Sequence, residues 1–490
     1  MRANLMFRDR DFDMNAPLCY GSNTLSIDLE LRHVVGKMAR GDDVVQEACD
    51  AALFTPLVSA DEISYRQENF RDALRNPGLV RLMYDILVET RERQKKSLHF
   101  LSSSVGLSDS LNSAVGLLRI FTETLAALRG FADDGIKAFS SEGFSGLMKM
   151  LKTELSDEFL NQVRTHLKEL RDQEERLVSA KLGPTGCATG YVLRRKSKLG
   201  LLGRLRLGPS FTIKEGDTDC MNDMDTRLDR AICDTVSVLS RIVRYMEDFF
   251  NMLRRELAFY VGCLNLDEFL RETGAPMCIP TLLPKDRENR AWRGLYDISL
   301  VIMKNSAVTG NELDAAGKRL YIVTGANQGG KSTFLRSFGQ AQLMAQCGMP
   351  VGAESFTAPI RDGIYTHFKK EEDARMKSGK LDEEMDRMSA IADRLHAGSL
   401  VIFNESFSST NEREGSEIHR QISKALTENG VEVFSVSHLY TYSAAFKDSP
   451  DVQFLRAERL EGGARTFKIV PGEPLETAFG EDIYRELFGA

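Results

Sequence analysis

The chain of 490 residues lacks the cysteine pairs that metal sites and disulfide scaffolds require. Its eight cysteines stand at positions 19, 49, 187, 220, 233, 263, 278 and 347. No two of them have the two-to-four-residue spacing of a zinc knuckle or a redox pair. This pattern favours reduced thiols in a cytosolic core. The length also excludes a small disulfide-stabilised fold, because a chain of this size can bury an apolar core of its own.

Export and membrane signals are also missing. The first thirty residues contain no apolar run of signal-peptide type and carry several charges, at Arg2, Arg8, Asp9, Arg10, Asp11 and Asp13. No uncharged apolar stretch reaches the roughly 18 residues that a membrane-spanning helix needs. We therefore expect a cytoplasmic protein without membrane contact.

Proline is absent from two long spans, one between Pro77 and Pro184 and one between Pro209 and Pro276. An interior proline costs a helix about 3 kcal/mol, so both spans favour long helices. In the second span, apolar side chains recur at steps of three and four, which predicts one helix of about thirty residues over 231–264. Similar stripes over 144–155 and 160–170 indicate two shorter helices that pack in a core.

The chain has no excess of positive charge, because 64 Lys and Arg stand against 71 Asp and Glu and give a net charge of -7. The window from 178 to 214 is the exception, since it has no acidic residue and eight basic ones: Lys181, Arg194, Arg195, Lys196, Lys198, Arg204, Arg206 and Lys214. Gly, Pro and Thr punctuate this window, which favours hairpins or loops. It is either a solvated basic surface or a contact for nucleic-acid phosphates. The second interpretation makes the first seven of these side chains candidate nucleic-acid contacts.

A glycine-rich loop follows the short apolar run 320–324. It reads Gly325, Ala326, Asn327, Gln328, Gly329, Gly330, Lys331 and Ser332, which is G-x-x-x-x-G-K-S, and Thr333 then opens a helical segment. In such a loop backbone amides surround phosphate oxygens, the lysine reaches the β and γ phosphates, and the serine hydroxyl ligates Mg²⁺. The sequence therefore predicts a P-loop that binds ATP and Mg²⁺.

Two further apolar segments end in polar residues of the kind that complete such a site. The segment 400–403 is followed by Asn404 and Glu405, where P-loop ATPases place a metal-associated carboxylate and a glutamate that polarises water. Asn404 is neutral, so we expect a weakened metal contact and slow turnover, with Glu405 and Lys331 as the catalytic residues. The segment 431–436 precedes His438, which can contact the γ-phosphate. The alternatives are a helix-capping role for Glu405 and an ordinary surface histidine.

The loop Thr324 to Thr333 closely resembles the T-G-x-N-x-G-G-K-S-T loop of the MutS family of DNA mismatch-repair ATPases. The resemblance continues in family order through Gly379 to Met385, which is similar to S-T-F-x-x-E-M, and through Asn404-Glu405, Thr410 to Gly415, and Ser437-His438. It implies that Thr410, Asn411, Glu414 and Gly415 form a signature loop that completes the ATP site of a partner subunit. The partner would be a second copy of the chain in a homodimer.

The resemblance also implies a multidomain fold, in which a mainly α-helical core and lever region is followed by an α/β P-loop ATPase domain of ABC type. The expected parts are an N-terminal segment 1–24, a first helical core part 25–115, a lever and clamp-like region 116–230, a returning helix and linker 231–285, and the ATPase domain 286–490. The basic window then falls where the family carries its DNA clamp.

Three departures from the family pattern qualify these expectations. The core-like region begins near residue 25, so we expect no mismatch-reading domain before it. Asn411 stands where a serine is usual. Where relatives stack an aromatic side chain on adenine, the sequence offers Ala307 and Val308, so adenine selectivity stays open.

We therefore expect an ATP-driven clamp that binds duplex, mismatched or branched DNA, acting on DNA structure rather than on single mismatches. The alternative is a nucleotide-switched assembly factor that grips a protein, RNA or ribosomal partner. A transporter subunit is disfavoured, because the chain has no L-S-G-G-Q motif and its helical arm is hydrophilic.

Overall fold

A computed structural model describes residues 1–99, 107–171, 177–184, 188–194, 217–370, 379–460 and 465–475. The chain divides into two compact units, and each combines segments that are far apart in the sequence. The first unit contains Met1–Ala3, Gly78–Ser140 and Phe144–Arg254. The second contains Asn4–Pro77, Ser141–Gly143 and the chain from Arg255 onward.

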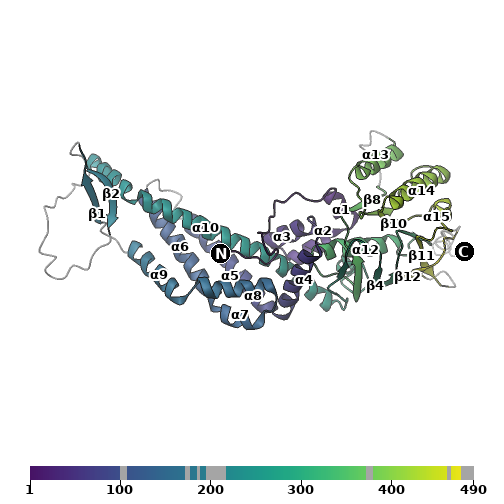
Figure 1. Ribbon diagram of the computed structural model, residues 1–490, viewed down its shortest axis with the longest axis horizontal. Coiled ribbons are helices and arrows are strands. Elements are labelled where there is room, and N and C mark those ends of the chain that lie inside the picture. Colours follow the sequence, from purple (N-terminus) through teal and green to yellow (C-terminus); the bar gives the residue numbers. More distant parts are fainter. Residues whose placement is uncertain are drawn as a thin grey trace. The chain divides into compact units, whose positions relative to one another are not determined.

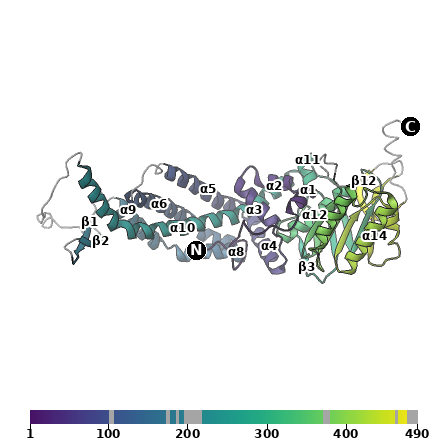
Figure 2. The ribbon, with the colours of Figure 1, turned by 90° about the horizontal axis from the view of Figure 1, so that it is seen from above.

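The first unit is a helical bundle with one hairpin (Figure 1). Its helices are α5 (Pro77–His99), α6 (Leu107–Gly130), α7 (Ala132–Ala138), α8 (Glu142–Glu154), α9 (Asp157–Arg171) and most of α10 (Thr218–Glu272). The hairpin pairs β1 (Leu177–Leu182) with β2 (Ala188–Arg194) in antiparallel fashion. Figures 1 and 2 both show the hairpin beside the first turns of α10.

Helix α10 has 55 residues and is longer than the thirty or so that the apolar stripe predicts. Apolar side chains such as Ile232 and Leu253 are buried along its later turns, whereas the turns before Arg230 are mostly exposed and polar. Those first turns carry only a sparse apolar series, Met221, Met224 and Leu228, in which both methionines are exposed, and they contain no proline that would end a helix. Helix α10 also binds α5 through Glu247, whose carboxylate accepts from the side chains of Arg91 at 2.9 Å and Gln94 at 2.7 Å.

Helix α6 is the one helix in the described part of the chain that is long and apolar enough to cross a membrane by length and composition. In its most apolar window, however, 61% of the residues are buried inside the protein. Phe121, for example, packs against Phe250 of α10 with ring centroids 5.3 Å apart. Packing within the bundle therefore accounts for the apolar character of α6.

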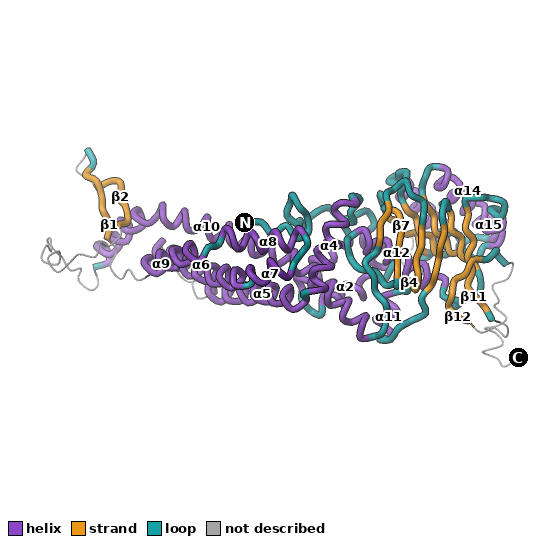
Figure 3. The backbone as a smooth tube through the Cα atoms, turned by 60° about the horizontal axis from the view of Figure 1, so that its bottom comes forward, coloured by secondary structure: helices purple, strands orange, loops and turns teal. Residues whose placement is uncertain are grey.

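The second unit begins with four helices and then builds two sheets (Figure 3). The first helices are α1 (Ser22–Asp28), α2 (Leu31–Ala39), α3 (Asp43–Leu53) and α4 (Ala60–Arg75). The later helices are α11 (Ile298–Lys304), α12 (Lys331–Gln346), α13 (Lys380–Ala392), α14 (Glu412–Glu428) and α15 (Tyr440–Ala444).

The larger sheet has six strands in the order β12-β11-β6-β10-β9-β8. Its strands are β6 (Leu320–Thr324), β8 (Ile364–Phe368), β9 (Leu400–Asn404), β10 (Glu432–Val436), β11 (Val452–Arg459) and β12 (Arg465–Pro471). All neighbours are parallel except β12, which runs antiparallel to β11. The central strands are apolar and buried almost throughout, as expected when helices cover both faces of a parallel sheet.

The smaller sheet has the order β3-β7-β4-β5, formed by β3 (Thr281–Leu283), β4 (Arg290–Leu295), β5 (Asn311–Ala315) and β7 (Ser355–Pro359). Helix α12 contacts strands of both sheets. A buried ion cluster also joins the sheets, because Arg290 of β4 and Arg361 both pair with Glu432 of β10. Gln342 of α12 accepts a further hydrogen bond from Arg290 at 3.0 Å. Helix α12, which follows the glycine-rich loop, is thus held by contacts with both sheets.

Candidate nucleotide-binding site

Three parallel strands end at the same edge of the larger sheet, and the predicted site residues follow them. The register places Val436 of β10 opposite both Val323 of β6 and Asn404 of β9. The glycine-rich loop, Glu405 and His438 therefore emerge next to one another. In open α/β sheets this edge, at the carboxyl ends of the strands, is where ligands bind.

The glycine-rich loop connects β6 directly to α12. Two of its glycines have backbone angles that other residues rarely adopt, with φ of 109° at Gly325 and 89° at Gly330. Strand β11 also approaches closely, since a Cβ on Gly329 would stand 2.7 Å from the Ala457 side chain. Glycine is therefore needed in this loop, both for the turn and for the close packing of β11. Helix α12 begins at Lys331.

The Lys331 ammonium points back into the loop. Its Nζ donates to the carbonyl oxygens of Gly325 at 2.9 Å and Ala326 at 3.0 Å, and the side chain is buried. Burial lowers the pKa of Lys331, the negative charge of Glu405 opposes that shift, and the positive charge of Arg465 adds to it. A cation held inside a ring of backbone groups is suited to phosphate oxygens.

Ser332 and Asn404 meet in the way the sequence predicts for a metal-associated pair. The Ser332 hydroxyl donates to Asn404 Oδ1 at 3.0 Å, so two neutral oxygens lie together at the end of β9. Mg²⁺ is usually bound by one or two carboxylates together with substrate phosphates and water. In the described part of the chain no group of three His, Cys, Asp or Glu residues could hold a metal. The pair fits Mg²⁺ that arrives with a phosphate ligand.

Glu405 follows Asn404 in the left-handed region, with φ of 53°. Its amide donates to the Val436 carbonyl at 2.9 Å, which keeps the residue at the edge of the sheet. The side chain remains partly exposed, and its Oε2 lies 3.9 Å from His438 Nδ1. Glu405 does not lie inside a helix, and it is not the cap of α14, which begins at Glu412.

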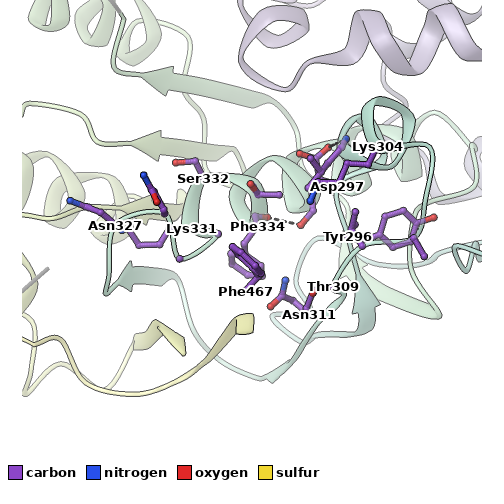
Figure 4. A pocket seen from close by; sticks show the side chains of 18 of the residues that line it. Tyr296, Asp297, Lys304, Thr309, Asn311, Asn327, Lys331, Ser332, Phe334 and Phe467 are labelled. Atoms are coloured by element: carbon purple, nitrogen blue, oxygen red, sulfur yellow. Dashed lines mark hydrogen bonds between the residues drawn. The ribbon is translucent and has the colours of Figure 1, made fainter. Parts of the chain in front are cut away.

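A cavity of about 840 Å³ joins these residues to a second set from the smaller sheet. Figure 4 shows Asn327, Lys331 and Ser332 on one side and Tyr296, Thr309 and Asn311 on the other, with Phe467 between them. Ala307 and Val308, the positions where the sequence offers no aromatic, also line the cavity.

Phe467 is a site residue that sequence reasoning missed. Between Ala457 and Arg459 the register of β11 against β12 shifts, and Phe467 lies in the resulting bulge with φ of 60°. Its side chain is 52% exposed and lines the cavity. Asn311 holds the following residues, since its Oδ1 accepts from the Ile469 amide at 2.7 Å. The one signal in the sequence that could have identified Phe467 is an aromatic residue on the last strand of the sheet.

The proposed signature residues form the start of α14. Asn411 is the N-cap, and its Oδ1 accepts from the Glu414 amide at 3.0 Å. The Thr410 hydroxyl donates to the Glu414 carboxylate at 2.7 Å, and side-chain hydrogen bonds from Thr410 and Asn411 to this carboxylate lower the pKa of Glu414. A Cβ on Gly415 would stand 2.3 Å from the Phe407 carbonyl oxygen. Asparagine is a good N-cap, which gives Asn411 a local role.

The basic window lies only partly in the described chain. Lys181 is exposed on β1, and Arg194 is the last residue of β2, opposite Leu177. The remaining candidates, Arg195, Lys196, Lys198, Arg204 and Arg206, lie outside the described residues, as does Lys214.

The structure is that of a multidomain protein with a helical unit and an α/β unit, in which a glycine-rich loop joins a parallel strand to a helix. This architecture is consistent with MutS-like domains. Residues 58–273 match the MutS2 N-terminal domain, and residues 321–469 match MutS domain V. The chain belongs to the MutS family.

Similar curated proteins carry the name DNA mismatch repair protein MutS. One from Thermus thermophilus is 29% identical over 184 residues, which are 37% of this chain and 22% of the relative. One from a Thermotoga species is 32% identical over 158 residues, or 32% of this chain and 20% of the relative. The matched part thus spans about a fifth of the length of these relatives.

Proposed function

We propose that the protein is an ATPase of MutS type that binds DNA as a homodimer. One observation carries the ATPase part, namely that Lys331, Ser332, Glu405 and Phe467 line one cavity at the carboxyl edge of a parallel sheet, with Asn404 bonded to Ser332 behind it. This is the arrangement of charge, hydroxyl, carboxylate and aromatic surface that a nucleoside triphosphate requires. The match to MutS domain V supports the same proposal.

Each part of the nucleotide has a partner in this cavity. The amides of Gly325 to Thr333, together with the Lys331 ammonium, bind the phosphates, and the exposed ring of Phe467 offers a face for the adenine. We expect His438 to contact the γ-phosphate, because its Nδ1 lies 3.9 Å from Glu405, a residue that lines the cavity. Glu405 orients the attacking water and accepts its proton, since the residue lines the cavity and its carboxylate lies 3.9 Å from His438 Nδ1.

Ser332 and Asn404 would hold Mg²⁺, and the bound ion would neutralise charge on the phosphates. Asn404 offers a carbonyl oxygen, which is a weaker ligand than the carboxylate usual at this position. We therefore propose that Mg²⁺ binds together with ATP and that turnover is slow.

The DNA part of the proposal rests on the basic window and on the names of the relatives. Eight positive charges in a window, 178–214, that contains no acidic residue can neutralise phosphates and release counterions. We propose that the homodimer closes when ATP binds, with Thr410, Asn411, Glu414 and Gly415 of each copy completing the site of the other.

The ATPase proposal is tested by two variants with opposite effects on binding. Lys331→Ala should abolish ATP binding, because it removes the cation from the phosphate loop. Glu405→Gln should retain ATP but hydrolyse it far more slowly, and should accumulate the closed dimer. Titration with a fluorescent ATP analogue and measurement of phosphate release separate the two effects. Equal hydrolysis rates in wild type and Glu405→Gln would show that Glu405 is not the base.

The DNA proposal is tested by a binding panel of homoduplex, mismatched DNA, branched DNA and RNA, with and without ATP, at two salt concentrations. We expect salt-sensitive DNA binding that falls when Arg194, Arg195 and Lys196 are all changed to Ala, with hydrolysis retained. Binding to RNA alone would favour the nucleotide-switched assembly factor instead. Absence of binding to every DNA would reject the clamp.

A further inference from the structure

The loop that follows the proposed catalytic base has an unfavourable backbone. Glu405 has φ of 53° and Phe407 has φ of 58°, although neither is a glycine. Such conformations persist when surrounding contacts hold them, and they often occur at functional sites. The contacts that hold residues 405–409 therefore determine where the Glu405 carboxylate points.

The strongest of these contacts comes from Glu384 on α13. Its side chain is buried, at 3% exposure. One carboxylate oxygen accepts from the Phe407 amide at 2.6 Å, and the other accepts from the Ser409 hydroxyl at 2.8 Å. Glu384 thus binds the loop at two points, both within four residues of Glu405.

His367 of β8 holds the same loop from a second direction. Its Nε2 lies 3.0 Å from the Glu384 carbonyl, which can only accept, so the neutral ring carries its proton on Nε2. The single proton of the Ser406 hydroxyl is then shared between Nδ1, at 2.8 Å, and the His367 carbonyl, at 2.5 Å. The ring also stacks on Phe407, with centroids 5.2 Å apart. Burial lowers the pKa of His367 to about 4, so the ring stays neutral near pH 7.

The other side of the loop rests on α14. The Phe407 carbonyl faces Gly415 so closely that a Cβ there would clash with it. Ser408 closes the turn, because its hydroxyl donates to the Glu405 carbonyl at 2.7 Å. Glu384 is therefore linked through one loop to the proposed base and to the proposed signature residues.

We infer that Glu384 is a positioning residue for ATP hydrolysis, which orients Glu405 by holding the amide of Phe407 and the hydroxyl of Ser409. The inference rests on the proposed ATPase function and assigns this role to a residue outside the cavity. Glu384 is not itself a base for the attacking water, because both of its oxygens are occupied by donors of the loop and it does not line the cavity.

The test compares Glu384→Ala with Glu384→Gln in the full chain. Alanine removes both contacts, and a displaced catalytic group can lower kcat about 100-fold, whereas the dissociation constant of ATP should change less than about twofold. Glutamine can restore both contacts, because its carbonyl accepts from Phe407 and its amide donates to the Ser409 oxygen. Glu384→Gln should therefore hydrolyse ATP at nearly the wild-type rate.

Two further variants make the result specific. Ser409→Ala removes one of the two contacts and should lower kcat by about tenfold, the effect of one hydrogen bond. The double variant Glu384→Ala with Ser409→Ala should have the same kcat as Glu384→Ala alone, since the carboxylate that Ser409 contacts is already absent. Asp386→Ala is the matched control, because Asp386 is an exposed carboxylate on the same helix. It should hydrolyse ATP like the wild type.

The outcomes separate this inference from the proposed function. Wild-type protein that binds no ATP would reject the ATPase proposal itself. Wild-type protein that hydrolyses ATP while Glu384→Ala matches it would overturn the positioning role alone. Loss of ATP binding in Glu384→Ala would show a structural role. If Glu384→Gln lost as much hydrolysis as Glu384→Ala, the charge of Glu384 would matter rather than its hydrogen bonds. Either of these also overturns the inference.

Discussion

Phe467 allows a sharp test of how the cavity would recognise a nucleotide. Phe467→Ala removes the aromatic ring that stands between the phosphate loop and the smaller sheet (Figure 4). The ring is 52% exposed, so its removal should leave the core of the second unit intact. Alanine also retains a Cβ at φ of 60°, so the backbone strain of the bulge is unchanged.

The expected loss follows from the energy of stacking a base on an aromatic side chain, which is about 1–3 kcal/mol. At about 1.4 kcal/mol for each factor of ten, the dissociation constant of ATP should rise about 5- to 150-fold. Phe467→Tyr keeps the ring and should bind ATP like the wild type. Isothermal titration with ATP measures both variants.

Tripolyphosphate provides the control ligand, because it has the phosphates of ATP without the base. Its affinity should be the same in wild type and Phe467→Ala, since Lys331 and the loop amides remain. If ATP and tripolyphosphate weaken equally, the substitution has distorted the loop through Arg465, whose Nη1 donates to the Gln328 side chain at 3.2 Å. If neither weakens, the base does not stack on Phe467 and the reasoning is refuted.

Three other predictions concern metal affinity, folding stability and pH. Asn404→Asp should strengthen the contact with Mg²⁺ and raise Mg²⁺-dependent turnover, and an unchanged dependence of phosphate release on Mg²⁺ concentration would contradict this. Glu432→Gln should lower the free energy of unfolding by about 3–5 kcal/mol, because it leaves the fully buried Arg290 without a carboxylate. Urea denaturation measures this loss. The control is Glu288→Gln, at a partly exposed ion pair with Arg319, which should cost under about 1 kcal/mol. Burial lowers the pKa of His419 from 6.5 to about 3. As the pH falls below 6.5, the His419 ring therefore binds a proton in the unfolded chain but not in the folded one. The free energy of unfolding that is present above pH 6.5 should be lost as the pH falls toward 3. His419→Phe should remove that part of the pH dependence, which is on the order of several kcal/mol at 1.36 kcal/mol per pKa unit, and equal pH profiles for the two proteins would refute it.

The sequence determined those parts of the protein whose chemistry is local along the chain. Lys331 and Ser332 stand at a fixed spacing after a buried strand, so their place at the start of a helix follows from the order of residues alone. The apolar period from Ile232 to Leu264 likewise indicated a long helix, although its full length depended on the lack of a breaker in the polar turns before it. The hairpin within the basic window agrees with the turn residues there.

Tertiary structure decided the contacts between segments that are distant in the sequence. Ser332 meets Asn404 because β6 and β9 flank β10 in the sheet, and residue order does not specify strand order. Phe467 reaches the cavity through a bulge opposite β11, and Glu384 reaches the loop after Glu405 from a different helix. Such contacts depend on packing and on backbone angles that ordinary residues rarely adopt, and neither has a periodic signal in the sequence.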